Sequence, residues 1–179
     1  MAKRQSLKEL QERLAQRLTA AKTEALTATW LAIEAGGHKL LLPLVQSGEI
    51  FPWSAVQPVP YTKPWYVGVA NLRGGLNGVV DLAGLLQGNA ARPVQRTADR
   101  VTSDARLVSL HGALGLNAVL WIDRLLGLRN PGAFKSVAQR PADAPTFITR
   151  LLIDDSGQAW QELDLQLLVN EPEFLAIAA

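Results

Sequence analysis

Residues 68–81 have the sequence Gly-Val-Ala-Asn-Leu-Arg-Gly-Gly-Leu-Asn-Gly-Val-Val-Asp, and this stretch says most about the fold. The pair Gly74-Gly75 indicates a turn, because glycine adopts the positive φ angles that tight turns need. An apolar run precedes the turn, and residues 76–81 are predicted to form a strand after it. Arg73 therefore lies at a strand-to-turn junction, where its guanidinium projects from the fold as a rigid, multidentate cation.

The same alternation of short strands and turns extends in both directions from this stretch. Upstream, residues 30–34 and 39–42 flank a Gly-Gly pair, which predicts a hairpin. Downstream, the turns at 111–113 and 154–157 each separate two apolar runs. The proline-rich segment 58–65 is predicted to be an extended loop, since prolines so close together cannot lie in a central strand.

Short strands at regular spacing, with few helices, predict a mainly β fold of small barrels or a sandwich. The hairpins fall on either side of a polar connection near residues 88–103, which suggests two lobes within a domain spanning residues 28–179. Asp164 is placed to cap a short C-terminal helix.

The segment 1–27 is predicted to be an amphipathic helical extension. Its apolar residues recur at steps of three and four, at Leu7, Leu10, Leu14, Leu18, Ala21 and Ala25. We expect the helix to pack on its own domain, because most amphipathic helices gain their stability that way. The alternative is a helix that binds a partner.

Composition excludes several classes of protein. Of the 179 residues, 48% are hydrophobic and 19% are charged, which is typical of a globular chain. A net charge of +2 without a dense Lys/Arg cluster argues against nucleic-acid binding. The absence of cysteine excludes disulfides and thiolate metal sites. We expect a cytoplasmic protein, since the charged start is unlike a secretory signal and no apolar run reaches the roughly 20 residues that span a bilayer.

Residues suited to catalysis are scarce. His38 and His111 both fall at predicted turns without further ligands nearby, so we expect no metal and no cofactor. Asp81 and Asp123 each follow an apolar run and would form an acid–base pair if they converged. Capping of a helix or turn is the preferred interpretation of both carboxylates. The sequence thus predicts a protein that is not an enzyme, with an Asp81/Asp123 enzyme as an alternative.

The span from Trp30 to Leu86 resembles the CheW family, the adaptors of bacterial chemosensory arrays. The order and spacing of several short pieces carry the resemblance: Gly48-Glu49-Ile50-Phe51-Pro52, Val59-Pro60, Pro64-Trp65-Tyr66-Val67-Gly68-Val69-Ala70-Asn71-Leu72-Arg73-Gly74 and Val79-Val80-Asp81-Leu82. The second half is similar more loosely, at 118–125 and 147–168. Gly78 departs from the family pattern, which usually has proline there.

The resemblance implies two small five-stranded SH3-like β-barrels that share an apolar seam. It also implies a non-catalytic adaptor that binds two partners: the CheW-like regulatory domain of a chemosensory histidine kinase and the cytoplasmic tip of a methyl-accepting chemoreceptor. Within the family the chain looks most like the PilI type, which serves twitching motility through type IV pili. Residues 68–71 and 81–86 and the helix ahead of the first strand carry this subtype.

Site residues follow from the resemblance. Arg73 is expected to mark the surface that faces receptor or kinase, with Glu49 and Ile50 on a neighbouring contact surface. The remaining residues are expected to shape this surface: Asn71 and Gly74 hold the turn, Asp81 is structural, and Val69 and Leu72 line the core or the groove.

Two alternatives remain open at this point. From composition alone, Arg73 is equally a surface arginine in an intramolecular salt bridge, and Glu49 has the same ambiguity. The second alternative is that the chain is a stand-alone interaction or dimerisation module outside chemosensing. Such a module would use the helix over residues 1–27.

Overall fold

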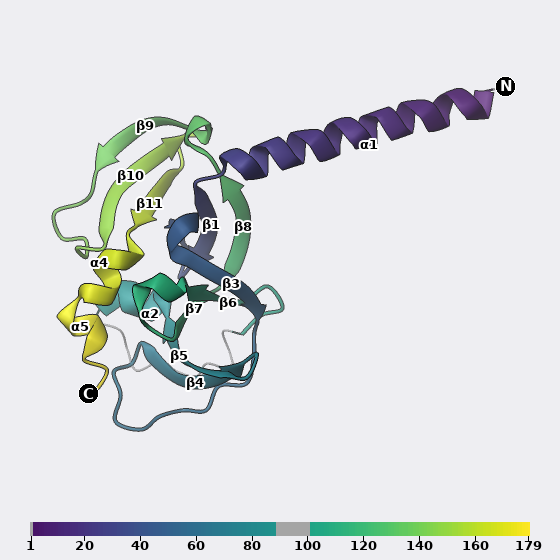
Figure 1. Cartoon of the computed structure of the whole chain (residues 1–179). Helices are drawn as coiled ribbons and strands as arrows, with labels where there is room; N and C mark the ends of the chain where they lie inside the picture. The colour runs from purple at the N-terminus through teal and green to yellow at the C-terminus, as the bar shows by residue number, and fades with distance from the viewer. Residues whose placement is uncertain (1, 89–100) are drawn as a thin grey trace.

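The computed structural model describes residues 2–88 and 101–179, which form two β-sheets with few helices (Figure 1). The first sheet has six strands in the order β8-β1-β2-β11-β10-β9. These strands are β1 (Trp30–Ala35), β2 (His38–Pro43), β8 (Arg124–Arg129), β9 (Phe134–Gln139), β10 (Ile148–Asp154) and β11 (Ala159–Leu163). We call this sheet and its interior the first lobe.

The second sheet has five strands in the order β3-β6-β7-β5-β4 and forms the second lobe. Its strands are β3 (Ser47–Pro52), β4 (Tyr66–Leu72), β5 (Gly75–Asp81), β6 (Arg106–Leu110) and β7 (Ala118–Ile122). Strands β3 and β4 are the two edges of this sheet. The proline-rich segment between them forms a loop, as predicted, apart from single bridges at Gln57 and Thr62.

Short helices lie beside the sheets. They are α2 (Leu82–Gln87), α4 (Leu165–Asn170) and α5 (Pro172–Leu175), with 3-10 turns η1 (Leu44–Gln46), η3 (Gly112–Leu114) and η4 (Pro131–Ala133). Asp164 caps α4 as predicted, since its Oδ1 accepts hydrogen bonds from the backbone N–H groups of Gln166 and Leu167. Pro172 lies in the first turn of α5 just beyond the end of α4.

Buried apolar side chains form three clusters. One lies inside the first lobe and includes Trp30, Leu41 and Trp160. One lies inside the second lobe and includes Leu107 and Trp121. The largest, which we call the seam, combines residues of both sheets with α2, α4 and α5: Leu31, Ile33, Leu40, Leu42, Val80, Leu82, Val108, Leu120, Ile122, Ile148, Leu163, Leu165, Leu168 and others. Two SH3-like lobes that share an apolar seam are therefore confirmed, with six strands rather than five in the first sheet.

The order in which the chain visits the lobes differs from the predicted grouping of hairpins. Strands β1 and β2 join the C-terminal strands, through the antiparallel pair β1–β8 and the parallel pair β2–β11. The chain thus crosses between the sheets after β2 and again after β7. The expected connection near residues 88–103 falls mostly on residues 89–100, which lie outside the described residues. The strands that flank it in sequence, β5 and β6, belong to the same sheet.

The expectation that the N-terminal helix packs on its domain is wrong for the side chains that the structure describes. Helix α1 (Ala2–Thr27) projects away from the sheets beside β1 and β8 (Figure 1). Every described side chain between Lys8 and Lys22 is exposed. The periodic leucines are too few, and the surrounding positions too polar, to draw this helix onto the body of the protein.

Candidate functional site

The β4–β5 hairpin ends in a two-residue turn at Arg73 and Gly74. Leu72 pairs with Gly75 across the turn, and the φ angles of Arg73 and Gly74 are 49° and 79°. Two consecutive positive φ angles are typical of the type I′ turn, whose twist matches that of the flanking strands. A non-glycine residue in this region is uncommon. The turn fixes the backbone from which the Arg73 side chain extends.

Arg73 forms an ion pair with Glu49 of β3. Its Nη1 lies 3.1 Å from Oε1 and 2.9 Å from Oε2 of Glu49. Its guanidinium carbon lies 5.8 Å from the centre of the Phe51 ring, also in β3. Because β3 and β4 are the two edges of the five-stranded sheet, the ion pair links these edges at one end of the second lobe.

Both partners of this ion pair remain accessible. The exposed fractions of the side chains are 75% for Arg73 and 54% for Glu49. Exposed pairs of this kind stabilise a fold by only about 0.2–1 kcal/mol, since water and salt screen them. The pair therefore contributes little to folding and leaves two oriented, opposite charges at the surface.

The other predicted site residues divide between surface and interior. Alternation along β4 buries Leu72 in the second lobe and exposes Asn71 on the opposite face. Val69 is half-buried, and its backbone pairs with Gln57 of the proline-rich loop. Ile50, in β3 beside Glu49, is 41% exposed. Arg73 and Glu49 thus meet at the surface, with Phe51 beneath Arg73, whereas Ile50 follows Glu49 directly in β3 and is exposed without a contact to Arg73 among the described interactions.

An open pocket of about 350 Å³ adjoins the Arg73–Glu49 pair. Sequence reasoning missed the polar residues in its lining, which are Asn77, Ser109, His111 and Asn117. Ser109 Oγ accepts a hydrogen bond from the Glu49 backbone N–H at 2.7 Å, and a Cβ on Gly48 would lie 2.4 Å from that oxygen. The glycine in Gly48-Glu49-Ile50 therefore lets β6 approach β3. The signal in the sequence was a single serine between the apolar residues Val108 and Leu110.

Gly78, the departure from the family pattern, lies against Tyr66 of the neighbouring strand. A Cβ at this position would come within 3.0 Å of the Tyr66 hydroxyl oxygen. The Tyr66 ring thus occupies the space that a larger side chain at position 78 would need.

Asp81 and Asp123 do not present two carboxylates to a common substrate. Asp81 is fully buried, and it occupies the N-cap position of α2 without a side-chain capping bond. Asp123 Oδ2 accepts a hydrogen bond of 2.7 Å from the Gly36 N–H, in the turn between β1 and β2. Acid–base catalysis needs a carboxylate that a substrate can reach, and the buried Asp81 cannot be reached.

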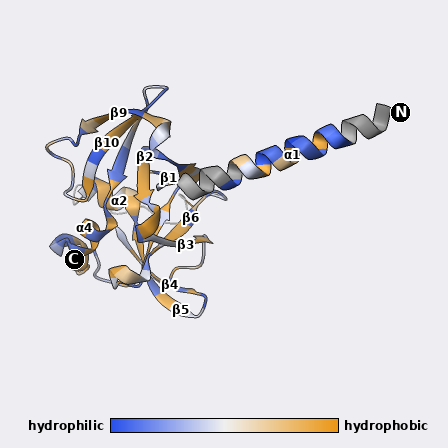
Figure 2. Ribbon diagram, turned by 45° about the horizontal axis from the view of Figure 1, so that its top comes forward, coloured by the Kyte–Doolittle hydropathy of each residue, from blue (hydrophilic) through white to orange (hydrophobic). Residues whose placement is uncertain are grey.

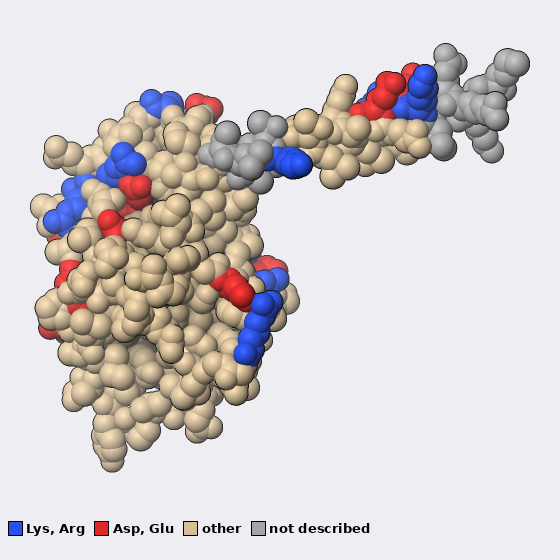
Figure 3. Space-filling model, viewed as in Figure 1, with Lys and Arg blue, Asp and Glu red and all other residues tan. Residues whose placement is uncertain are grey.

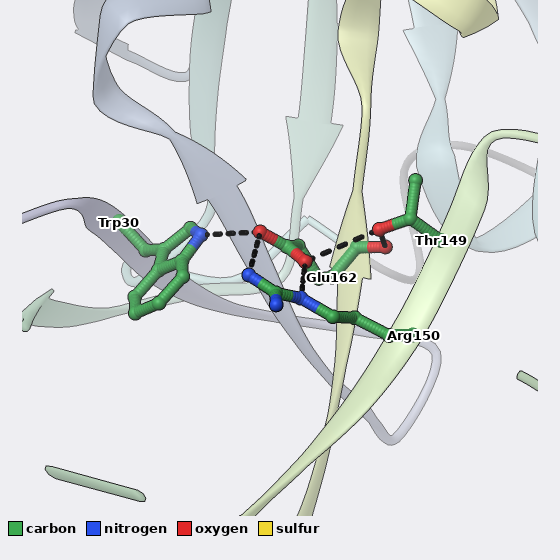
Figure 4. A network of polar contacts seen from close by, with 4 residues as sticks. All are labelled: Trp30, Thr149, Arg150 and Glu162. Atoms are coloured by element: carbon green, nitrogen blue, oxygen red, sulfur yellow. Dashed lines mark hydrogen bonds and ion pairs between the residues drawn. The ribbon is translucent and has the colours of Figure 1, made fainter. Parts of the chain in front are cut away.

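A polar network in the first lobe was not foreseen from the sequence (Figure 4). Glu162 of β11 accepts hydrogen bonds from Trp30 Nε1 at 2.9 Å and Thr149 Oγ1 at 3.2 Å, and it forms an ion pair with Arg150. The bond to Glu162 raises the pKa of Arg150. Because its oxygens are shared among three partners, the mostly buried carboxylate is satisfied within the fold, and the network ties β1, β10 and β11 together.

Neither a metal site nor a membrane span is found in the described part of the chain. No group of three or more His, Cys, Asp or Glu residues there could hold a metal ion. None of the described helices is both long and apolar enough to cross a membrane.

Comparison with known proteins identifies one family. The family model described as CheW-like domain matches residues 29–173. No curated protein matches the chain. Among solved structures, the scaffolding protein TtCheW from Thermoanaerobacter tengcongensis is similar, with a TM-score of 0.61 and 17% identity over 83% of this chain and 90% of that one. At this identity the likeness concerns the fold.

Proposed function

Since the chain belongs to the CheW-like domain family, we propose that it is a non-catalytic adaptor that couples methyl-accepting chemoreceptors to a chemosensory histidine kinase. The observation that carries the proposal is the Arg73–Glu49 pair, which combines high exposure with a fixed backbone. Such a residue suits a binding interface, because the backbone that carries it loses little conformational freedom when a partner binds. The partners proposed are the CheW-like regulatory domain of the kinase and the helical tip of the receptor.

Arg73 is the residue proposed to contact a partner, with Glu49 and Ile50 beside it. A central arginine of an interface can contribute about 2 kcal/mol or more, which corresponds to roughly 30-fold in affinity. We expect Arg73→Glu to abolish co-purification with the kinase domain or the receptor fragment. The melting temperature should change little, because the exposed pair is worth about 0.2–1 kcal/mol.

Two further variants sharpen this test. Arg124→Glu is the matched control, since Arg124 also forms an exposed ion pair, with Asp104 at 3.7 Å, but in β8. The double variant Arg73→Glu/Glu49→Arg restores an ion pair between the sheet edges while leaving the wrong charge at position 73. Binding that stays lost in the double variant supports direct contact by Arg73. Binding restored by the swap, or undiminished in Arg73→Glu, would remove Arg73 from the interface.

We further propose that the chain is of the PilI type and serves twitching motility through type IV pili. The support is the sequence of residues 68–71 and 81–86 and the helix α1 ahead of the first strand. Pilus genes next to the gene for this chain would favour this subtype, and flagellar genes would argue against it.

A further inference from the structure

Helix α1 lies outside residues 29–173, the part of the chain that matches the family. At about 1.5 Å per residue its 26 residues extend about 39 Å. Along its described part, apolar residues are interspersed in a mostly hydrophilic helix (Figure 2). Leu10, Leu14 and Leu18 are 56%, 51% and 70% exposed. Leucines four residues apart share a helix face, so they form a stripe that the described residues of this chain leave exposed.

Charges are distributed unevenly around this leucine stripe. With 3.6 residues per turn, Arg13 and Arg17 fall on one flank and Lys8 and Lys22 on the other, about 60–120° from Leu14. Glu9 and Glu12 fall on the opposite side of the helix, at about 140–160°. Both signs of charge are visible along the helix in Figure 3. The stripe therefore lies between two basic flanks.

These basic flanks make a second copy of the chain an unfavourable partner for the leucine stripe. In a parallel pair of α1 helices, the Arg13/Arg17 flank would face the Lys8/Lys22 flank of the other copy. In an antiparallel pair, each flank would face its own equivalent. Like charges oppose each other in both arrangements, and flanking charges of this kind select the partners of paired helices.

The width of the stripe disfavours a lipid surface. Helices that lie in a membrane interface have a broad apolar face opposite a strongly charged one. From Leu10 to Leu18 the stripe spans only about 80° of the helix circumference. A narrow stripe with polar surroundings is typical of a seam between two helices.

We propose that α1 is a docking arm for an amphipathic helix of another protein, whose leucine stripe is flanked by glutamate or aspartate. Burial of the three leucines would supply the affinity, and the acidic flanks opposite Arg13, Arg17, Lys8 and Lys22 would set specificity. The arm does not depend on the Arg73 surface, so it can be tested separately from the adaptor function.

The test uses the full chain and two synthetic helical peptides of about 28 residues, long enough to match α1 at about 1.5 Å per residue. Both carry leucines at steps of three and four; one has glutamate on both flanks of the stripe and the other has lysine. In fluorescence anisotropy we expect the glutamate peptide to bind at least 10-fold more tightly than the lysine peptide. The quadruple variant Lys8→Glu/Arg13→Glu/Arg17→Glu/Lys22→Glu should reverse this preference.

The leucines are tested with Leu10→Ala/Leu14→Ala/Leu18→Ala, which should weaken binding of the glutamate peptide at least 10-fold. Alanine is the best helix former, so the variant keeps its helix, which circular dichroism checks. The matched control Glu12→Gln/Gln16→Ala changes the side opposite the stripe and should leave affinity unchanged.

Several outcomes would overturn the docking arm. Equal affinity for both peptides would show that the basic flanks of α1 do not distinguish an acidic partner from a basic one. Dimerisation through α1 in light scattering would assign the stripe to a second copy. Tighter association with phosphatidylethanolamine/phosphatidylglycerol vesicles than with the glutamate peptide would assign it to a lipid surface. Retention of the Arg73-dependent binding in all α1 variants is the expected result in every case, since the arm does not depend on the Arg73 surface, and it separates failure of the arm from failure of the adaptor function.

Discussion

At the scale of single residues, Gly68 shows how a backbone contact supports the candidate site. Its φ is 146°, and a Cβ there would lie 2.1 Å from the carbonyl oxygen of Gln57. Next to it, Val69 and Gln57 exchange backbone hydrogen bonds of 2.8 and 2.9 Å. Glycine thus allows the proline-rich loop to pack on β4, the strand that leads to Arg73.

We therefore predict that Gly68→Ala destabilises the protein. Overpacking against backbone costs about 1–3 kcal/mol and the strained φ about 1–3 kcal/mol more. For a chain of this size, a loss of about 3 kcal/mol lowers the melting temperature by roughly 6–12 °C. The control is Gly112→Ala, because nothing lies within 4 Å of a Cβ at Gly112. Equal melting temperatures for the two variants, measured by calorimetry, would contradict the contact.

Sequence reasoning at this scale located Arg73 but left its surroundings undetermined. The turn was predictable, since Gly74 follows Arg73 directly. The pairing with Glu49 was not, because the two residues are 24 positions apart and meet only when β3 and β4 become the edges of one sheet. The salt-bridge interpretation and the interface interpretation are compatible, since the pair is intramolecular and also exposed.

At the scale of elements, the β10–β11 hairpin depends on one carboxylate. Asp154 Oδ1 accepts bonds from the Ser156 N–H, the Ser156 hydroxyl and the Gln158 N–H, at 3.0, 2.6 and 2.9 Å. Its Oδ2 accepts a bond of 3.0 Å from Trp160 Nε1. These bonds, led by those from Ser156 and Trp160, lower the pKa of Asp154 from 3.8 to about 2.

This shift predicts a dependence of hairpin stability on pH. A carboxylate with a lowered folded-state pKa stabilises the fold above its unfolded pKa, and the stabilisation is lost as pH falls through the folded value. The melting temperature of the wild type should therefore exceed that of Asp154→Ala by a constant amount above about pH 5. The difference should shrink between about pH 4 and pH 2, where Asp154 becomes protonated. A difference independent of pH over this window would exclude the ionised carboxylate as its cause.

The sequence predicted the hairpins well where a turn signal separates two apolar runs, as in β1–β2 and β10–β11. It did not predict β8 and β9. Strand β9 is exposed along almost its whole length, so it lacks alternation. Strand β8 contains Gly127 at φ 105° beside an irregular pairing with β1, which breaks its pattern. Both are edge strands, where burial constrains the sequence least.

At the scale of the whole molecule, the two-lobed β fold followed from the rhythm of strands, and the shared seam followed from the resemblance. The assignment of strands to sheets could not be predicted from local patterns. Strand β2 pairs with β11 in parallel, with Leu40 beside Gln161, far apart in the sequence. Only the packing of the complete chain specifies such pairings. The same non-local connections raise the question of whether the lobes unfold together.

Adjacent leucines in β2 allow this to be tested, because Leu40 and Leu41 are both fully buried but face opposite sides of the first sheet. Leu40 belongs to the seam, and Leu41 belongs to the interior of the first lobe. Truncation of either to alanine should cost about 2–5 kcal/mol. The seam is the largest cluster and joins both sheets, so we expect the protein to unfold as one cooperative unit.

Leu41→Ala gives the more decisive measurement, since its cavity lies wholly within the first lobe. If the seam couples the lobes, the slowest-exchanging amides of β6 and β7 should lose the same free energy of protection as those of β1 and β2. Leu40→Ala, with its cavity in the seam, should produce the same uniform loss. Unchanged protection of β6 and β7 in Leu41→Ala, with loss only in the first sheet, would mean that the lobes are separate folding units. The seam would then hold together two lobes that unfold independently, rather than coupling them into one cooperative unit.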